Sequence, residues 1–154
     1  MALKILKDGR GVTFIELLLV FAVLSVMLVA VFVFVNPVEM RQRGRDERRL
    51  SDLQMLDRMV AEYLVDYGAY PDDADTLRVS TSSPGLFWIN ADLSRYAARL
   101  PTDPLNDSTY FYSYKHTATG YELNARLEFN LEIAAADGGN DPTLYELGNA
   151  LEIL

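Results

Sequence analysis

The sequence contains no cysteine, and only one histidine and one tryptophan, in 154 residues. Without cysteine the chain can form no disulfide, no thiolate metal site and no thiol nucleophile. The single histidine, His116, lies among polar residues where we predict a hairpin turn, so we expect it to be solvated rather than catalytic. No Walker-type glycine loop, HExxH pattern or nucleophile elbow is present either. We therefore do not expect an enzyme.

Basic residues are scarce outside the N-terminal third of the chain. The sequence carries 14 basic and 22 acidic side chains, a formal net charge of −8. Residues 1–50 hold 8 of the basic and 5 of the acidic groups, which leaves 6 basic and 17 acidic groups in residues 51–154. An acidic surface of this kind repels nucleic-acid phosphates, so we expect no direct nucleic-acid partner.

One long apolar run stands apart from the rest of the sequence. In residues 12–35, 21 of 24 residues are apolar, and the exceptions are Thr13, Glu16 and Ser25. A helix of the last 19 of these residues is roughly 28 Å long, which is close to the thickness of the bilayer hydrocarbon. The run is longer than the core of a secretory signal peptide and ends without a small-x-small cleavage site. We predict one membrane span, whose orientation the flanking basic residues do not decide.

A specific motif, KDGRGVTFIELLLV over residues 7–20, marks the start of this run. A basic leader ends in Gly11, and a glutamate follows five residues later. This motif resembles the type III signal sequence of type IV pilins and of the pseudopilins of type II secretion. The resemblance implies that a prepilin peptidase/N-methyltransferase cuts after Gly11, on the cytoplasmic side, and methylates Val12. It makes Glu16 the family's fifth-position glutamate, although that family more often has phenylalanine or methionine where this chain has Val12.

The Glu16 carboxylate has a chemical role that does not depend on the resemblance. After cleavage Val12 would carry an ammonium group, and both this ammonium and a carboxylate are costly in hydrocarbon. Each offsets the desolvation of the other if one subunit's Glu16 meets the N-terminus of its neighbour. Alternatively, Glu16 lies near the lipid headgroups or caps the helix, where an acidic side chain favours the dipole. We expect Glu16 to set the register of assembly.

An amphipathic segment follows the span. Apolar residues recur there at steps of three and four, which predicts one packed helix face that comprises Leu50, Leu53, Leu56, Met59, Val60, Tyr63, Leu64 and Tyr67. The helix should stop near Gly68, since Pro71 prevents its continuation. Pro37 predicts a bend within one helix rather than two helices, whereas pilin-like proteins commonly bend a few residues earlier, where this chain has Val33. Five arginines between residues 41 and 49 predict either an anchor near lipid headgroups or intersubunit salt bridges.

The rest of the chain predicts a small globular head. Residues 68–90 are rich in turn formers and predict a connecting loop, residues 91–100 predict a short helix, and alternating residues 110–115 and 121–128 predict an antiparallel hairpin. A third strand is expected at residues 144–147, and Trp88 is interpreted as a packing anchor. The segment at residues 96–106 also resembles the head of major pilins and pseudopilins.

We therefore predict an α+β, pilin-like fold in which a long N-terminal helix packs against an antiparallel sheet of about three strands. Its segments are a leader at residues 1–11, a transmembrane and assembly helix at 12–36, its amphipathic continuation at 37–67, and the head at 68–154.

The C-terminal region lacks the cysteine pair that bounds a loop in many pilins. Secretion pseudopilins hold such a loop with calcium, and the resemblance makes Asp137, Asn140 and Asp141 candidate ligands, because they supply oxygen atoms around two glycines. The spacing is not that of an EF-hand, and an acidic surface turn is the alternative. We expect no other metal or cofactor.

Taken with the resemblance, these features predict a major-type prepilin that polymerises through its N-terminal helix into a type IV pilus-like filament. The alternative is a major pseudopilin that forms a short periplasmic filament in type II secretion, and a more remote one is a permanently anchored binding or enzymatic domain. Expected partners are copies of the chain itself, the prepilin peptidase, an inner-membrane assembly platform and, before assembly, membrane lipid. The precursor would be a single-pass membrane protein with a cytoplasmic N-terminus, later part of a surface pilus or periplasmic filament.

Overall fold

The structure, a computed structural model, describes residues 11–34, 36–82 and 86–154. Its elements follow the chain in the order α1 (Phe14–Phe34), α2 (Pro37–Tyr67), β1 (Arg78–Val79), β2 (Tyr112–His116), β3 (Tyr121–Arg126), α3 (Leu131–Ala134) and β4 (Leu144–Gly148). The chain divides into two compact units, residues 1–40 and residues 41–154. The first contains α1, and the second is the head with most of α2.

Helix α1 begins directly after a capping threonine. The Thr13 hydroxyl accepts a hydrogen bond from the Glu16 backbone N–H at 3.3 Å, and the Thr13 carbonyl accepts one from Leu17 at 3.1 Å. The helix contains two polar side chains, Glu16 and Ser25, and Ser25 donates its hydroxyl to the Phe21 carbonyl at 2.8 Å. Capping and internal pairing leave α1 with an almost wholly apolar surface.

Helix α2 starts anew at Pro37, so the prediction of one bent helix is wrong. Asn36 is the reason, because its side-chain oxygen accepts from the backbone N–H of Val38 at 3.2 Å, while its amide donates to the Glu39 carboxylate at 3.0 Å. An N-cap asparagine, proline at the first helical position and glutamate at the third together form a strong start signal. Val35 lies outside the described residues.

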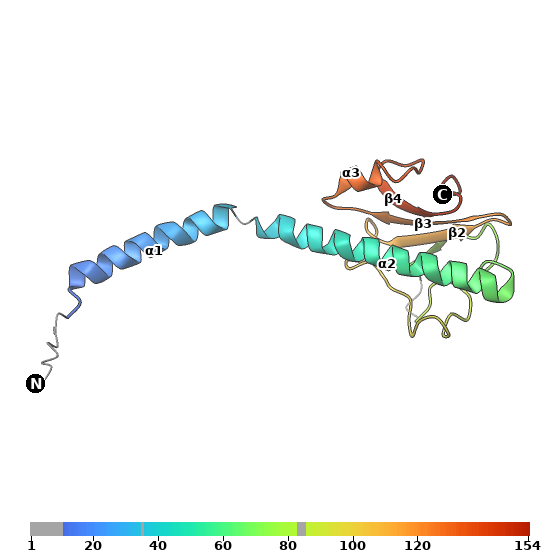
Figure 1. Cartoon of the computed structure of the whole chain (residues 1–154), viewed down its shortest axis with the longest axis horizontal. Coiled ribbons are helices and arrows are strands. Elements are labelled where there is room, and N and C mark those ends of the chain that lie inside the picture. Colours follow the sequence, from blue (N-terminus) through green and yellow to red (C-terminus); the bar gives the residue numbers. More distant parts are fainter. Residues whose placement is uncertain (1–10, 35, 83–85) are drawn as a thin grey trace, which may run out of the picture. The chain divides into compact units, whose positions relative to one another are not determined.

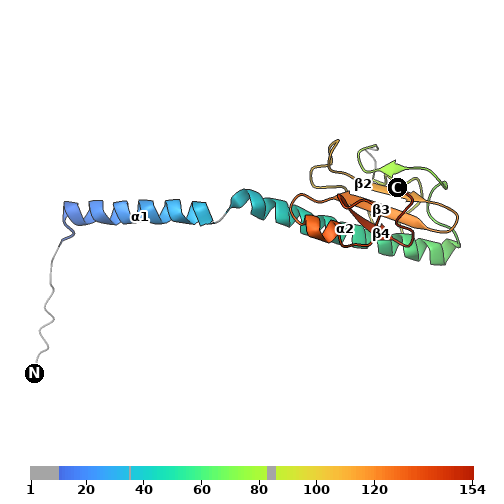
Figure 2. The same cartoon turned by 90° about the horizontal axis from the view of Figure 1, so that it is seen from above.

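The amphipathic face of α2 packs over the sheet (Figures 1 and 2). Its buried apolar side chains are Leu53, Leu56, Met59 and Val60. They join one core cluster with Tyr112, Tyr114 and Leu123 of the hairpin, and with Trp88, which is 4% exposed. The packing role of Trp88 is thus confirmed, and so is the middle of the predicted face; Leu50 and Leu64 are half-buried outside the core cluster, and Tyr67 is exposed. As predicted, α2 stops just before Gly68, where φ is +69°.

The sheet has four antiparallel strands in the order β1-β2-β3-β4. The predicted hairpin is confirmed, with Tyr114 opposite Leu123 and Tyr112 opposite Ala125. The predicted third strand is β4, which pairs with β3. The two-residue strand β1 was not expected, because two residues inside a turn-rich loop show no alternation.

The predicted short helix at residues 91–100 is absent. The Asp92 carboxylate accepts from both the backbone N–H and the hydroxyl of Ser94, and such local bonds compete with a helix. Leu93 and Leu100 are nevertheless buried, so this segment packs on the core without being helical. A four-residue helix, α3, instead follows β3, where no helix was predicted.

Candidate assembly site

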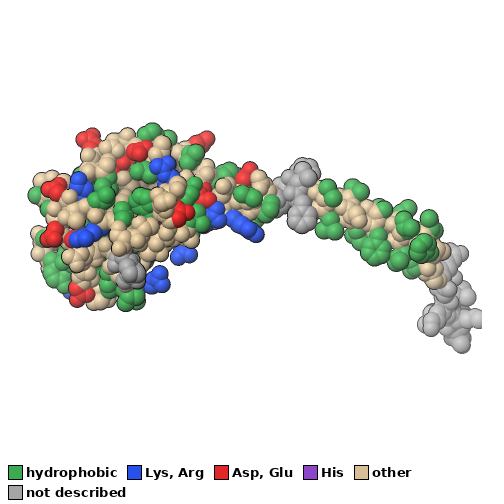
Figure 3. Space-filling model, turned by 180° about the vertical axis from the view of Figure 1, so that it is seen from behind, with side chains coloured by type: hydrophobic (Ala, Val, Ile, Leu, Met, Phe, Trp, Pro, Cys, Tyr) green, Lys and Arg blue, Asp and Glu red, His purple; other side chains and the backbone are tan. Residues whose placement is uncertain are grey.

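Helix α1 exposes its side chains on all sides among the residues that the structure describes. The 18 residues Phe14–Val31 have a mean hydropathy of 2.8 and none of them is buried, which makes the helix long and apolar enough to cross a membrane. Hydrophobic side chains accordingly cover this segment in Figure 3. Apolar side chains around a whole helix are stable only in lipid or against other apolar helices. The predicted membrane span is therefore present as a helix.

Glu16 lies in the first turn of α1 and is exposed. Together Thr13 and Glu16 occupy the N-cap and third helical positions, an arrangement in which an acidic side chain favours the helix dipole. This is the local role considered above as the alternative, and it does not conflict with a role in assembly.

The predicted cleavage site immediately precedes α1. Gly11 and Val12 are exposed and non-helical, and the Gly11 backbone has no neighbouring atom within 4 Å of where a Cβ would lie. An accessible peptide outside a helix is what a protease requires. Val12 lies before the first residue of α1 in the uncut chain. Val12 and Glu16 therefore do not lie one turn apart on one helix face. Cleavage and methylation stay predictions, and the leader, residues 1–10, lies outside the described residues.

The arginine cluster after the span divides into internal and external members, a division that no pattern in the sequence indicated. Arg49 is fully buried, and it donates to Asp46 at 2.9 Å and to both oxygens of Asp103. It also donates to Glu128 at 2.7 Å, and Arg45 forms a bidentate pair with that same carboxylate. Arg45 and Arg49 therefore hold α2 to the head rather than to lipid or to another subunit.

Electrostatic effects in this buried cluster follow from its contacts. The Arg45 hydrogen bond, more than that of Arg49, holds the pKa of Glu128 below its usual value. Burial alone would lower the pKa of Arg49, but its hydrogen bonds to Asp103 and Glu128 outweigh burial and raise the pKa. Asp46 accepts three backbone N–H groups, those of residues 128–130. Every charge in the cluster is thus paired, as burial requires.

The remaining arginines face outward. Arg41 and Arg48 are exposed, and the Arg48 side chain approaches Asp52 at 3.5 Å. The Arg43 guanidinium lies 4.1 Å from the centre of the Phe129 ring. The predicted headgroup or intersubunit roles stay open for these outward residues.

The candidate calcium ligands do not form a coordination sphere as the structure places them. Asp137 accepts hydrogen bonds from the backbone of Gly139 at 2.9 Å and of Glu146 at 2.7 Å, and Asp141 accepts two from Thr143. The Asn140 amide lies 3.5 Å from the Leu154 carbonyl. Within the described ranges, no group of three or more acidic or histidine side chains is arranged to hold a metal ion. The calcium site therefore stays a prediction that the geometry does not favour.

Buried carboxyl groups lie beside this loop, and no pattern in the sequence indicated them. Glu122 and Glu146 are 0% and 1% exposed, and each has one oxygen without a hydrogen-bond partner. Burial, and then the neighbouring Glu122 carboxyl group, raise the pKa of Glu146 to about 7. Charged residues that alternate in a strand predict a solvated face, but here the C-terminal segment covers it, with Ile153 and Leu154 donating to Glu122.

The expectation that His116 is solvated is wrong. It is the last residue of β2 and only 5% exposed, with its ring nitrogens 3.1 Å from the Asp72 carbonyl and 3.0 Å from the Thr117 carbonyl. The turn begins one residue later than predicted, and the loop after α2 covers the ring. Both nitrogens are occupied by backbone, so His116 has a structural role.

Comparison with known families gives a match to this chain. The family model for type II secretion system (T2SS), protein G, matches residues 37–126, more than half of the chain. The matched part comprises α2, the connecting loop and the hairpin, and it leaves out the leader motif and α1. No curated protein and no solved structure matches this chain. The match confirms the pilin and pseudopilin resemblance by a part of the chain separate from the signal motif, and the chain belongs to the type II secretion system protein G family.

Proposed function

We propose that this chain is a pseudopilin that polymerises through α1 into a filament of a type II secretion system. One observation carries the proposal: none of the 18 residues Phe14–Val31 is buried, in a chain of the protein G family. A helix apolar on all sides needs lipid or neighbouring helices around it. In this proposal the same side chains contact lipid before assembly and copies of α1 afterwards.

Glu16 supplies the register of the proposed filament. A cut after Gly11 leaves an ammonium group on Val12, and the Glu16 carboxylate of a neighbouring subunit is its natural counter-ion in hydrocarbon. Sliding one helix past the other would separate these two charges, whereas the apolar side chains alone tolerate many registers. One charge pair therefore selects a single stagger.

The family match reverses the order of the two functional predictions. The sequence favoured a type IV pilus subunit first and a secretion pseudopilin second, whereas the matched family is that of secretion protein G. A type IV pilus-like filament is the second candidate, because the signal motif at residues 7–20 is common to both. A permanently anchored binding or enzymatic domain is the most remote candidate, because it gives no role to Glu16.

The proposed function implies a partner for this chain at each step from precursor to filament. The precursor enters the inner membrane as a single-pass protein with its N-terminus in the cytoplasm, where a prepilin peptidase/N-methyltransferase cuts and methylates it. An assembly platform in the same membrane then adds it to a homopolymer whose acidic heads face outward into the periplasm.

Mass spectrometry of the purified chain tests the first step. We expect a mature N-terminus at Val12, carrying one methyl group, and an uncut chain when Gly11→Val blocks the site. Deleting the gene should abolish export of secreted proteins if the filament is a pseudopilus, and should remove long surface fibres if it is a pilus. An intact leader in cells that contain the peptidase would contradict the proposal.

A further inference from the structure

One exposed stripe of α2 carries opposite charges at its two ends. Residues seven positions apart lie on nearly the same side of a helix. Arg41 and Arg48 are related in this way near the start of α2, and Glu62 continues the same series near its end, with Asp66 one turn further on. All four residues are exposed, whereas Met55, which lies between Arg48 and Glu62 in this series, packs against the core, so the stripe consists of two exposed patches at the ends of α2.

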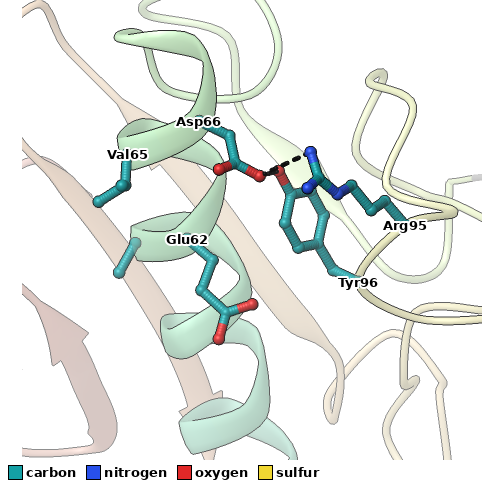
Figure 4. Close-up of a pocket in the computed structure, with 6 residues that line it drawn as sticks. Glu62, Val65, Asp66, Arg95 and Tyr96 are labelled. Atoms are coloured by element: carbon teal, nitrogen blue, oxygen red, sulfur yellow. Dashed lines mark hydrogen bonds and ion pairs between the residues drawn. The ribbon is translucent and has the colours of Figure 1, made fainter.

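The acidic end of the stripe borders a groove of about 440 Å³. Its lining is formed by Ala61, Glu62, Val65, Asp66, Arg95 and Tyr96 (Figure 4). Asp66 is held in place, since it accepts the Tyr96 hydroxyl at 2.7 Å and pairs with Arg95 at 3.1 Å. Glu62 forms no ion pair with any described residue, and Val65 is 84% exposed beside it. The groove thus offers an uncompensated carboxylate next to an apolar contact.

The basic end of the stripe has a bare surface at Gly44. Glycine inside a helix costs about 0.5–1 kcal/mol relative to alanine, so it needs a reason. Within the described chain there is none, because a Cβ at Gly44 would meet nothing within 4 Å and its φ is not positive. Arg41 and Arg48 flank this position, and Arg41 forms no ion pair with described residues. A neighbouring element can therefore approach the backbone closely between two cations.

We propose that the acidic groove of one copy binds the basic end of α2 of a second copy. If the α2 helices of the two copies run parallel and one is shifted along the other by 21 residues, Arg41 of one copy lies opposite Glu62 of the other, and Gly44 lies opposite Val65. Opposite charges then meet, and the exposed Val65 side chain meets the bare backbone at Gly44. This shift is about 31 Å along the helix. The two patches differ, so the contact is heterologous and repeats into an open fibre instead of closing into a dimer. The inference rests on the proposed filament function.

Cysteine cross-linking tests this contact directly, because the chain contains no cysteine of its own. Cells would express the full chain with Gly44→Cys and Val65→Cys, and oxidation should give a ladder of covalent dimers and higher multimers. A matched control combines Gly44→Cys with Ala118→Cys on the exposed β2–β3 turn, and should give no ladder. A ladder that is absent from assembled filaments of the first variant, or equally strong in the control, would overturn the contact.

Charge reversal tests the same contact through assembly. Glu62→Lys should lower the assembled fraction about fivefold, which equals about 1 kcal/mol, and adding Arg41→Glu should restore it. Glu132→Lys makes the same charge change on exposed α3 and should have no effect. An unchanged assembled fraction in Glu62→Lys, or no recovery when Arg41→Glu is added, would overturn the inference. If Arg41→Glu alone lowers the assembled fraction and the loss depends on the content of anionic lipid, Arg41 binds lipid headgroups and the inference is also overturned. If the wild-type chain forms no Glu16-dependent filament, the proposed function fails; if it does and these variants behave like wild type, only this contact fails.

Discussion

Replacing Arg49, the buried arginine that contacts the head, should greatly lower the stability of the folded chain. Arg49→Met keeps much of the side-chain length but removes the cation that contacts Asp46, Asp103 and Glu128. Asp46 retains three backbone donors and Glu128 retains Arg45, but one oxygen of Asp103 loses its only partner among the described residues.

Breaking one side of a buried ion pair costs about 3–5 kcal/mol, because a charge stays buried without its partner. A domain of this size is stable by about 5–15 kcal/mol, so the variant should lose a large share of its stability. The measurement is the free energy of unfolding of the full chain in detergent, followed by denaturant titration.

A neighbouring residue provides the control for this experiment. Arg48→Met removes a cation whose side chain is 62% exposed and 3.5 Å from Asp52, and such surface pairs contribute about 0–1 kcal/mol. A second variant, Arg49→Met with Asp103→Leu, removes both charges and should recover part of the loss. Equal effects of Arg48→Met and Arg49→Met, both below about 1 kcal/mol, would refute the interpretation that this buried cluster holds α2 to the head.

Two further predictions concern the C-terminal part of the sheet. The pKa of Glu146 is raised by burial from its usual 4.5 to about 7, so the folded state keeps this proton where the unfolded state has lost it. The contribution of Glu146 to stability should therefore be greatest below about pH 4.5 and should fall as the pH rises towards 7. Melting temperature measured against pH should show this dependence in the wild-type chain and lose it in Glu146→Gln. A profile in that variant equal to that of the wild type would contradict the assignment. Calcium should leave the melting temperature unchanged, because the carboxylates of Asp137 and Asp141 already accept hydrogen bonds from the backbone of Gly139, Thr143 and Glu146. A rise in the melting temperature that chelation reverses would contradict this.

The sequence predicted the elements whose patterns repeat. The apolar face of α2, the hairpin and β4 all depend on periodicity, which burial enforces over many residues. Boundaries set by one or two side chains were less predictable. Asn36 starts a second helix, and Asp92 prevents the expected short helix, because single hydrogen bonds decide at those points between otherwise similar conformations.

Residues of the candidate site were predictable where the motif is local. Gly11, Val12 and Glu16 follow from one short segment, and the structure places them at the start of α1 as exposed residues. The pairing of Arg49 with Asp103 joins residues 54 positions apart, so spacing alone carried no signal for it. The same holds for Glu122 and Glu146, whose burial depends on how the C-terminal segment folds back over β3.

Electron microscopy of filaments from cells that express the wild-type chain or Glu16→Ala tests the central claim most directly. The account predicts filaments that contain the wild-type chain cut after Gly11. It predicts that Glu16→Ala enters the membrane and is cut, but is absent from filaments, because α1 then lacks the charge that selects one register. Incorporation of Glu16→Ala at the wild-type level would contradict the account.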